Sequence, residues 1–209
     1  MTAPDCQLYL ISPLDVSGLF PDRLARALDA GPVAAFQFRV KDTDEHAAVK
    51  LAVPLQDICA RHDVAFIVND SISLAKRLGA DGVHLGQDDG EVADARQRLG
   101  KEAQIGVACK DSRHLAMEAG EAGADYVSFG AFYPSTTKVT THQADVDLLS
   151  WWSGLFEIPV VAIGGITPVN CAPLIAAGAD FLAVCNGVWG GDEALAVADF
   201  ARAMASVPR

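Results

Sequence analysis

Eight short apolar segments alternate with amphipathic segments along this 209-residue chain and predict an α/β fold, a single-domain (β/α)₈ TIM barrel spanning residues 1–209. Most of the apolar segments are continuous runs, which is typical of parallel strands that are buried on both faces. A short repeat, Gly-Ala-Asp followed by an apolar run, occurs three times and indicates a recurring supersecondary unit.

The segments between the expected strands have the apolar spacing of helices. Leu51, Leu55 and Ile58 fall at i, i+4 and i+7, which places them on one helix face. No linker interrupts the alternation, so a single domain is expected. The eight strands are expected at Gln7–Ser12, Ala34–Val40, Ala65–Asn69, Gly82–Leu85, Gln104–Ala108, Tyr126–Gly130, Pro159–Ile163 and Phe181–Val184.

Each copy of the repeat is expected to end a helix and begin a strand. The copies start at Gly79, Gly123 and Gly178, and glycine at a helix end adopts a left-handed conformation that other residues resist. An open doubly wound sheet is the alternative fold. Such a sheet would begin with a Gly-rich turn after the first strand, whereas this chain has Ser12-Pro13-Leu14 there. The barrel is therefore favoured.

The composition argues against membranes and nucleic acids as partners. Apolar residues make up 51% of the chain, but no run approaches the ~18 residues of a membrane span. The first residues lack the features of a secretory signal. A net charge of −11 disfavours nucleic-acid binding, although one pocket can still be locally positive for a small anion. Five cysteines without a CxxC pair indicate reduced thiols and a cytoplasmic location.

The second expected strand ends in a cationic sequence that predicts an anion site. A period of two places Gln37, Arg39 and Lys41 on one face and Phe36 and Phe38 on the other. The apolar face should lie under the helices, so the cationic face should point into the barrel mouth, where cations are costly without an anion. Chemistry gathers at the carboxyl ends of barrel strands, so we expect an anionic ligand here.

Carboxylates follow the third and fourth expected strands. Asp70 comes directly after Asn69, and Asp89 follows the fourth strand, with Asp88 as a second candidate. Mg²⁺ is typically held by one or two carboxylates together with phosphate oxygens and water, so Asp70 and Asp89 predict a Mg²⁺ site beside the cations. Asp70 could instead cap the following helix. His84, within the fourth strand, is expected to be a core histidine.

The late strands are followed by sequences that suit a second, monophosphate site. Ser135-Thr136-Thr137-Lys138 offers three hydroxyls and a mobile charge, with a surface loop as the alternative. Gly164-Gly165 allows either close approach of a ligand or a tight turn, and Thr167 is expected to cap the next helix. Backbone amides at Cys185-Asn186 would complete the phosphate site that recurs after the last two strands of this fold.

Together these motifs resemble the thiamine phosphate synthase family, from Leu8 to near Asn186. The resemblance implies a (β/α)₈ transferase that joins hydroxymethylpyrimidine diphosphate to a thiazole phosphate, with Mg²⁺ as cofactor, and releases pyrophosphate. The matching segments are Gln37-x-Arg39-x-Lys41, Asn69-Asp70, Gly82-Val83-His84-Leu85-Gly86-Gln87-Asp88-Asp89, Thr137-Lys138 and Ile163-Gly164-Gly165-Ile166.

The resemblance also implies a role for each group of residues. The pyrimidine diphosphate would be bound by Gln37, Arg39, Lys41, Asn69 and Lys138. The three cations of this set would be the catalytic residues, because they neutralise the leaving pyrophosphate. The Mg²⁺ ligands would be Asp70 and Asp89. The thiazole phosphate would be bound by Ser135, Thr136, Thr137, Gly165, Cys185 and Asn186.

Five positions depart from the family pattern. Ala108 replaces a serine, Val40 a glutamate and Phe181 a glycine, and Cys185-Asn186 replaces an Ile/Val-Ser pair. Two alternatives stay open: a related barrel that tautomerises the thiazole phosphate without a metal, and a non-catalytic binder of thiamine precursors. The complete set of diphosphate-binding residues favours the transferase. A homo-oligomer is left open, since the apolar Trp151-Trp152 segment suits either barrel packing or a subunit contact.

Overall fold

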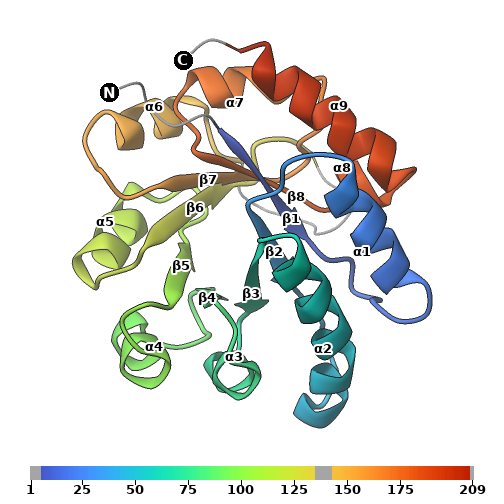
Figure 1. Cartoon of the computed structure of the whole chain (residues 1–209). Coiled ribbons are helices and arrows are strands. Elements are labelled where there is room, and N and C mark those ends of the chain that lie inside the picture. The colour runs from blue at the N-terminus through green and yellow to red at the C-terminus, as the bar shows by residue number, and fades with distance from the viewer. Residues whose placement is uncertain (1–5, 135–142, 208–209) are drawn as a thin grey trace.

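The computed structural model of the chain describes residues 6–134 and 143–207. Within these residues, eight parallel strands close into a barrel in sequence order, from β1 round to β8 (Figure 1). The predicted (β/α)₈ fold is therefore confirmed. The strands are β1 Gln7–Ile11, β2 Ala35–Phe38, β3 Ala65–Asn69, β4 Gly82–Leu85, β5 Gln104–Ala108, β6 Tyr126–Gly130, β7 Val160–Ile163 and β8 Phe181–Val184.

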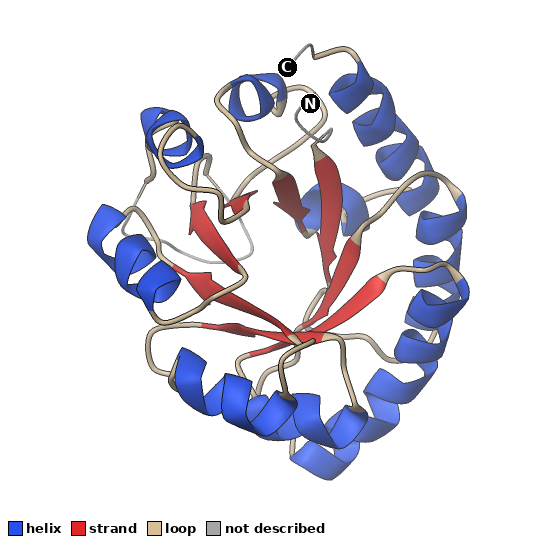
Figure 2. Ribbon diagram, turned by 60° about the vertical axis from the view of Figure 1, so that its left-hand side comes forward, coloured by secondary structure: helices blue, strands red, loops and turns tan. Residues whose placement is uncertain are grey.

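The helices surround the barrel on its outside (Figure 2). The last strand is followed by the short helix α8 and then by α9, which packs against α1 and closes the ring of helices. None of the helices in the described part of the chain is long and apolar enough to span a membrane. The helices are α1 Phe20–Asp29, α2 Glu45–Arg61, α3 Ile72–Leu78, α4 Val92–Leu99, α5 Arg113–Glu121, α6 Asp147–Ser153, α7 Ala172–Ala176, α8 Asn186–Trp189 and α9 Glu193–Ala205.

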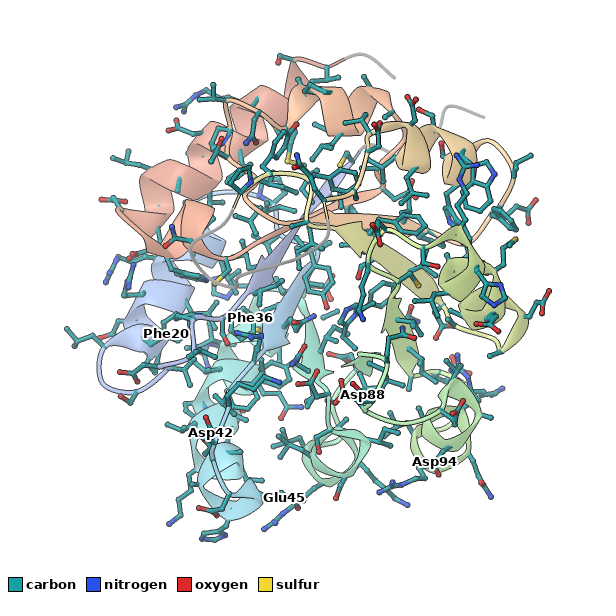
Figure 3. All side chains as sticks on the ribbon, turned by 180° about the vertical axis from the view of Figure 1, so that it is seen from behind. Phe20, Phe36, Asp42, Glu45, Asp88 and Asp94 are labelled. Carbon is teal, nitrogen blue, oxygen red and sulfur yellow. The ribbon has the colours of Figure 1, made fainter. Side chains whose placement is uncertain are left out.

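The barrel wall separates two apolar layers, and β2 shows how the sequence divides between them. Phe36 and Phe38 point outward into the layer beneath the helices, where the Phe36 ring lies 6.3 Å from that of Phe20 on α1 (Figure 3). Gln37, between them, is 3% exposed and points into the barrel. Phe181, where the family has glycine, packs inside the barrel near the start of β8. The alternation predicted for β2 is thus confirmed from Phe36 to Phe38.

The Gly-Ala-Asp repeat is a device that joins neighbouring strands. The glycine of each copy has a positive φ, of 58°, 89° and 103° in turn. In the first copy, Asp81 donates its backbone N–H to the Phe66 carbonyl and accepts the Phe66 N–H with its side chain at 2.7 Å. The same two bonds link Asp125 with Ile105, and Asp180 with Val160. The repeat therefore anchors β4, β6 and β8 to the strand before each of them.

Three strands are shorter than the sequence predicted, although all eight are present. Proline has no N–H to donate, so β7 begins after Pro159. The first two strands stop early because the N–H of Arg39 bonds to a side chain instead of to the backbone of β1. The differences are Gln7–Ile11 in place of 7–12, Ala35–Phe38 in place of 34–40, and Val160–Ile163 in place of 159–163.

Candidate active site

The carboxyl ends of β2 and β3 bring a cation and a carboxylate into contact. Arg39 and Lys41 follow the end of β2 at Phe38 and so lie in a loop, not on the strand as the period of two assumed. The Lys41 Nζ contacts the Asp70 carboxylate, which follows β3. The Lys41 side chain is 46% exposed, so a ligand at the barrel mouth can reach this ion pair.

Asp70 does not cap the following helix. Ser71 has that role, since its Oγ accepts the Leu74 N–H at 3.1 Å, and the helix-cap alternative for Asp70 is wrong. Asp70 itself has φ of 66°, an uncommon conformation for a non-glycine residue that is often found at functional sites. Its backbone is held there by donation of its N–H to the His84 carbonyl at 2.8 Å. The carboxylate is therefore available to Lys41 and to a ligand.

Asp89 lies beside Asp70 and is fixed by its own loop. Its Oδ2 accepts the Gly86 N–H at 2.8 Å, and a Cβ at position 86 would come within 2.6 Å of this oxygen. Burial raises the pKa of the Asp89 carboxyl, the neighbouring Asp70 raises it further, and the Gly86 N–H opposes the rise. Asp88, on the same loop, is exposed (Figure 3). A cation shared by Asp70 and Asp89 would relieve the repulsion between these carboxylates.

Two carboxylates suit Mg²⁺ only if a ligand completes its coordination. Across residues 6–134 and 143–207, no cluster of three or more His, Cys, Asp or Glu side chains could hold a metal by itself. Mg²⁺ usually keeps several waters and binds through one or two carboxylates plus substrate phosphates. The donor set at Asp70 and Asp89 therefore fits Mg²⁺ bound together with a phosphorylated substrate.

Beneath this charged rim, the barrel interior holds a neutral chain of hydrogen bonds. Gln37 Nε2 donates to the Tyr9 hydroxyl at 3.0 Å, and the Tyr9 and Tyr126 hydroxyls are 3.0 Å apart. His84 Nδ1 lies 3.1 Å from the Tyr126 hydroxyl, and its Nε2 lies 3.4 Å from Ser128 Oγ. Burial lowers the pKa of His84 to about 4, so the ring is neutral at pH 7. The prediction of a satisfied core histidine is confirmed.

Sequence reasoning missed the two tyrosines of this chain. Their hydroxyls meet across the barrel although the residues are 117 positions apart. The available signal was a polar atom at an inward-facing position of an otherwise apolar strand. Asn69, which was predicted, is the half-buried last residue of β3 and pairs in register with His84. Gln37 and Asn69 thus both lie where a ligand in the mouth would meet the barrel interior.

After β7, the two glycines are required by packing. Gly164 and Gly165 have φ of 105° and 64°, and a Cβ on Gly165 would lie 2.4 Å from the Pro134 carbonyl oxygen. Asn170 braces this turn by donating to the Gly165 carbonyl at 3.0 Å and accepting the Thr167 N–H at 2.8 Å. Thr167 is therefore not a helix cap, and α7 begins only at Ala172. The turn interpretation accounts for both glycines, and a phosphate role for Gly165 stays a prediction.

After β8, Cys185 and Asn186 lead directly into α8. Asn186 is exposed, and the Cys185 thiol donates to the Ser12 carbonyl at 3.5 Å. The other end of α8 is fastened to β1, since the Trp189 indole N–H donates to the Ile11 carbonyl at 2.7 Å. Hydrogen bonds to the carbonyls of Ser12 and Ile11, at the end of β1, therefore hold the Cys185-Asn186 turn and the helix that follows it.

An ion-pair cluster supports α8 from outside the barrel. The Glu193 carboxylate is only 5% exposed and accepts from Arg23 Nε at 2.9 Å and from Arg26 Nε at 2.9 Å. Arg23 also donates to the carbonyls of Trp189 at 2.9 Å and Gly191 at 3.3 Å. Burial alone would raise the pKa of Glu193, but hydrogen bonds from the two arginines bring it below its usual value. We call Arg23, Arg26 and Glu193 the α1–α9 clasp.

One predicted segment lies outside the described residues, and one position that departs from the family pattern lies at the end of β5. Ser135-Thr136-Thr137-Lys138 falls in the undescribed residues, so the structure does not place its hydroxyls or its ammonium group. Ala108, where the family has serine, ends β5, and its carbonyl accepts from Gln87 Nε2 at 2.8 Å. Gln87 thus connects the β4 loop to the end of β5 through the backbone of residue 108.

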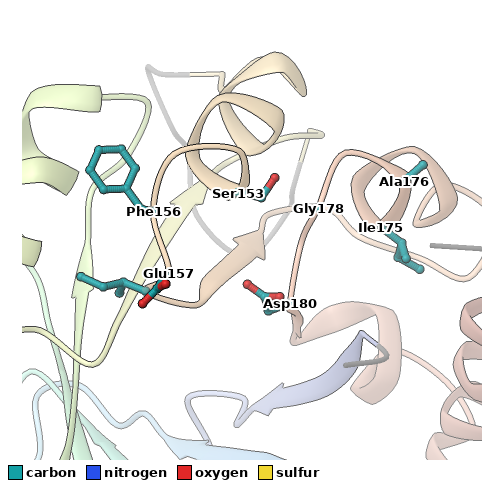
Figure 4. Close-up of a pocket in the computed structure, with 8 residues that line it drawn as sticks. Ser153, Phe156, Glu157, Ile175, Ala176, Gly178 and Asp180 are labelled. Carbon is teal, nitrogen blue, oxygen red and sulfur yellow. The ribbon is translucent and has the colours of Figure 1, made fainter. Parts of the chain in front are cut away.

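A pocket of about 330 Å³ lies at the face of the barrel where the strands begin, opposite the candidate active site (Figure 4). Its lining includes Glu157 and Asp180, which come just before β7 and β8. Catalytic groups of (β/α)₈ barrels lie instead at the carboxyl ends of the strands. None of the predicted site residues lines this pocket. It is therefore separate from the candidate active site.

Comparison with known proteins gives one consistent result. The sequence profile of the family described as thiamine monophosphate synthase matches residues 8–188. The thiamine-phosphate synthases of Erythrobacter litoralis and Rhodospirillum centenum are 69% and 52% identical, over 96% of this chain and 96% and 98% of theirs. The structure of thiamine phosphate pyrophosphorylase from Pyrococcus furiosus superposes with a TM-score of 0.85 at 28% identity, covering 97% of each chain.

Proposed function

The chain belongs to the thiamine monophosphate synthase family, and we propose that its barrel mouth joins a pyrimidine diphosphate to a thiazole phosphate with the help of Mg²⁺. The protein is a transferase of thiamine biosynthesis and forms thiamine phosphate. One observation carries the extension to particular residues: the contact between Lys41 and Asp70, beside Asp89, at the ends of neighbouring strands. Side chains of both signs meet there, as a metal-bound diphosphate requires.

Arg39 and Lys41 would stabilise the departing pyrophosphate. As the bond between the pyrimidine methylene carbon and the diphosphate oxygen breaks, negative charge accumulates on the leaving oxygens. Fixed cations near those oxygens lower the barrier, because they interact more strongly with the transition state than with the bound substrate. Lys138 would add a third cation, and its placement lies outside the described residues.

Asp70 and Asp89 are proposed to hold Mg²⁺ on the diphosphate. The bound ion would supply further neutralisation of the leaving group. Lys41, which contacts Asp70, would then turn to the phosphate oxygens, since its ammonium group no longer has the carboxylate to itself. Gln37 and Asn69, deeper in the mouth, would fix the pyrimidine ring against the neutral barrel interior.

The reaction needs no covalent nucleophile from the protein. The thiazole nitrogen is itself nucleophilic, so the remaining contribution is orientation of two bound substrates. We propose that Cys185, Asn186 and Gly165 bind the thiazole phosphate, together with the hydroxyls of residues 135–137. Cys109 does not serve as a nucleophile, because it is fully buried and burial raises its pKa to about 12. The five cysteines are reduced in the structure, which supports the cytoplasm as the proposed location.

The proposed function is tested by mixing the protein with hydroxymethylpyrimidine diphosphate, thiazole phosphate and Mg²⁺. Thiamine phosphate is detected as its fluorescent thiochrome after oxidation. We expect product only when both substrates are present, loss of product with EDTA, and recovery when excess Mg²⁺ is restored. Product formation that is unchanged by EDTA would contradict the metal role. Absence of product from folded protein that binds either substrate would reject the transferase in favour of a binder or a tautomerase.

A further inference from the structure

A buried serine on β1 makes two hydrogen bonds with the backbone of a proposed catalytic arginine. Ser12 Oγ accepts the Arg39 N–H at 2.9 Å and donates to the Arg39 carbonyl at 3.1 Å. Ser12 is fully buried, so its hydroxyl contacts the Arg39 backbone from the protein interior and is not exposed to bind a ligand itself. A single hydroxyl therefore fixes both backbone polar groups of the residue that follows β2.

The hydroxyl replaces a bond that the barrel would otherwise make between main chains. Ser12 donates its N–H to the Gln37 carbonyl at 2.9 Å, which is the last regular bond between β1 and β2. In a parallel ladder the next bond would run from the Arg39 N–H to the Ser12 carbonyl. Because Ser12 Oγ accepts that N–H, the Ser12 carbonyl is left to accept the Cys185 thiol at 3.5 Å.

We propose that Ser12 is a positioning residue that sets the backbone of Arg39 for the diphosphate and connects it to the Cys185 turn of the thiazole phosphate site. The inference rests on the proposed function, because Arg39 needs a set position only if its loop binds the diphosphate. Ser12 touches no substrate in this proposal. It acts through Arg39 on one side and Cys185 on the other, at the junction of β1, β2 and β8.

The direct test is amide hydrogen exchange in the otherwise intact protein. Ser12→Ala removes both bonds to Arg39, so the Arg39 amide should exchange at least about tenfold faster, as expected for loss of roughly 1.4 kcal/mol of protection. The Gln37 amide, which does not depend on the hydroxyl, serves as an internal reference. Unchanged exchange at Arg39 would overturn the proposal. Ser12→Cys keeps the branching of the side chain with a somewhat larger atom and a weaker hydrogen-bonding group, and it tests the same point if the alanine variant does not fold.

The functional test uses inorganic pyrophosphate with Mg²⁺ as the probe, measured by calorimetry. Ser12→Ala should weaken pyrophosphate binding about tenfold and raise KM for the pyrimidine diphosphate more than KM for the thiazole phosphate. Ser112→Ala is the matched control: it removes a serine hydroxyl that accepts a backbone N–H, from Leu115, at a helix cap outside the proposed site. Equal effects of the two variants on pyrophosphate binding would reduce Ser12 to a stability role and overturn the proposal.

A double-mutant cycle separates action through Arg39 from independent action. In an Arg39→Ala background, Ser12→Ala should weaken pyrophosphate binding by less than about twofold, because the guanidinium that the hydroxyl positions is gone. If the loss of pyrophosphate affinity in the double variant equals the product of the losses in the two single variants, the proposal is contradicted. If the wild-type protein binds pyrophosphate but forms no thiamine phosphate, the proposed function is wrong. The double-mutant cycle can still be measured in that case, because it depends only on pyrophosphate binding.

Discussion

In the proposed function, the two halves of the barrel mouth would bind phosphate by opposite means. The early half, after β2, β3 and β4, carries its charge on the side chains of Arg39, Lys41, Asp70 and Asp89. The late half, after β7 and β8, contributes glycines, Cys185 and Asn186 and has no charged side chain among its described predicted residues. A leaving diphosphate needs neutralisation, whereas a phosphate that only anchors a substrate is adequately held by neutral donors.

The halves also differ in how they are held. Lys41 and Asp70 form their contact at the rim, with side chains 46% and 28% exposed, so a ligand can rearrange it. The late half is fixed from behind by the α1–α9 clasp, in which the Glu193 side chain is 5% exposed. The charged contact of the early half is therefore open to a ligand, whereas the carboxylate that supports the late half is buried. Variants in the first should change chemistry, and variants in the second should change stability and thiazole phosphate binding.

Loss of a proposed metal ligand should have the largest effect and should impair the early half alone. Asp89→Asn removes a carboxylate charge while keeping the side-chain size, and kcat should fall at least about 1000-fold. Thiazole phosphate binding, measured by calorimetry, should stay within about twofold of wild type. Asp88→Asn, on the exposed neighbouring position, is the control and should retain activity. If Asp88→Asn were the inactive variant, the metal ligand would be misassigned.

Removing the rim cation should cost less than removing the metal ligand. Lys41→Gln should lower kcat/KM for the pyrimidine diphosphate about 100-fold, because one charge that stabilises the leaving group is lost. Steady-state kinetics at two salt concentrations check this, since the wild-type rate should depend on salt more steeply than that of the variant. Lys101→Gln, a surface lysine paired with Glu102, changes the net charge equally and should leave the rate unchanged. Similar losses in both variants would point to net charge instead of the site.

Breaking the clasp should separate stability from chemistry. Glu193→Gln leaves Arg23 and Arg26 without their carboxylate, and the free energy of unfolding should fall by about 2 kcal/mol. KM for the thiazole phosphate should rise several-fold, while pyrophosphate binding stays unchanged. Chemical denaturation and substrate titrations measure the two effects. A larger effect on pyrophosphate than on thiazole phosphate would contradict the division of the mouth into two halves.

The same carboxylate should make stability depend on pH in the acid range. The pKa of Glu193 is lower in the folded protein than its ordinary value near 4.5, so the folded state binds fewer protons there than the unfolded state. Glu193 contributes its full stabilisation of the fold above the pKa that it has in the unfolded chain. This stabilisation is lost as the pH falls through the pKa that it has in the folded protein. Denaturation midpoints should therefore decline less steeply below pH 4.5 in Glu193→Gln than in wild type. Parallel curves would assign the acid sensitivity to other carboxyls.

The smallest effect is expected at the brace of the β7 turn. Asn170→Ala removes the bonds to the Gly165 carbonyl and the Thr167 N–H, and should cost about 1 kcal/mol of stability. KM for the thiazole phosphate should rise about two- to fivefold with kcat unchanged. Thermal unfolding and initial-rate measurements are sufficient to detect both. A fall in kcat without a change in KM would place this turn in the chemistry instead of the anchoring.

Local sequence features predicted most of the fold. Short apolar segments, most of them continuous, marked all eight strands, and the alternation around Gln37 correctly placed the phenylalanines outside and the amide inside. These signals survive because side-chain direction in a strand follows a period of two that a few residues establish. Element ends were less predictable. Ser71 caps α3, a role that had been considered for Asp70. Thr167, which had been expected to cap the next helix, instead donates its backbone N–H to the Asn170 side chain.

Local sequence patterns were sufficient to predict the barrel, the order of its strands, and which charged residues follow which strand. Three long-range contacts became visible only in the folded chain: Ser12 with Arg39, Tyr9 with Tyr126 across the barrel, and Glu193 of α9 with the arginines of α1. The two kinds of feature depend on residues at different separations along the chain. Periodicity is a property of neighbouring residues, whereas these contacts depend on the register and closure of all eight strands, which no short stretch of sequence contains.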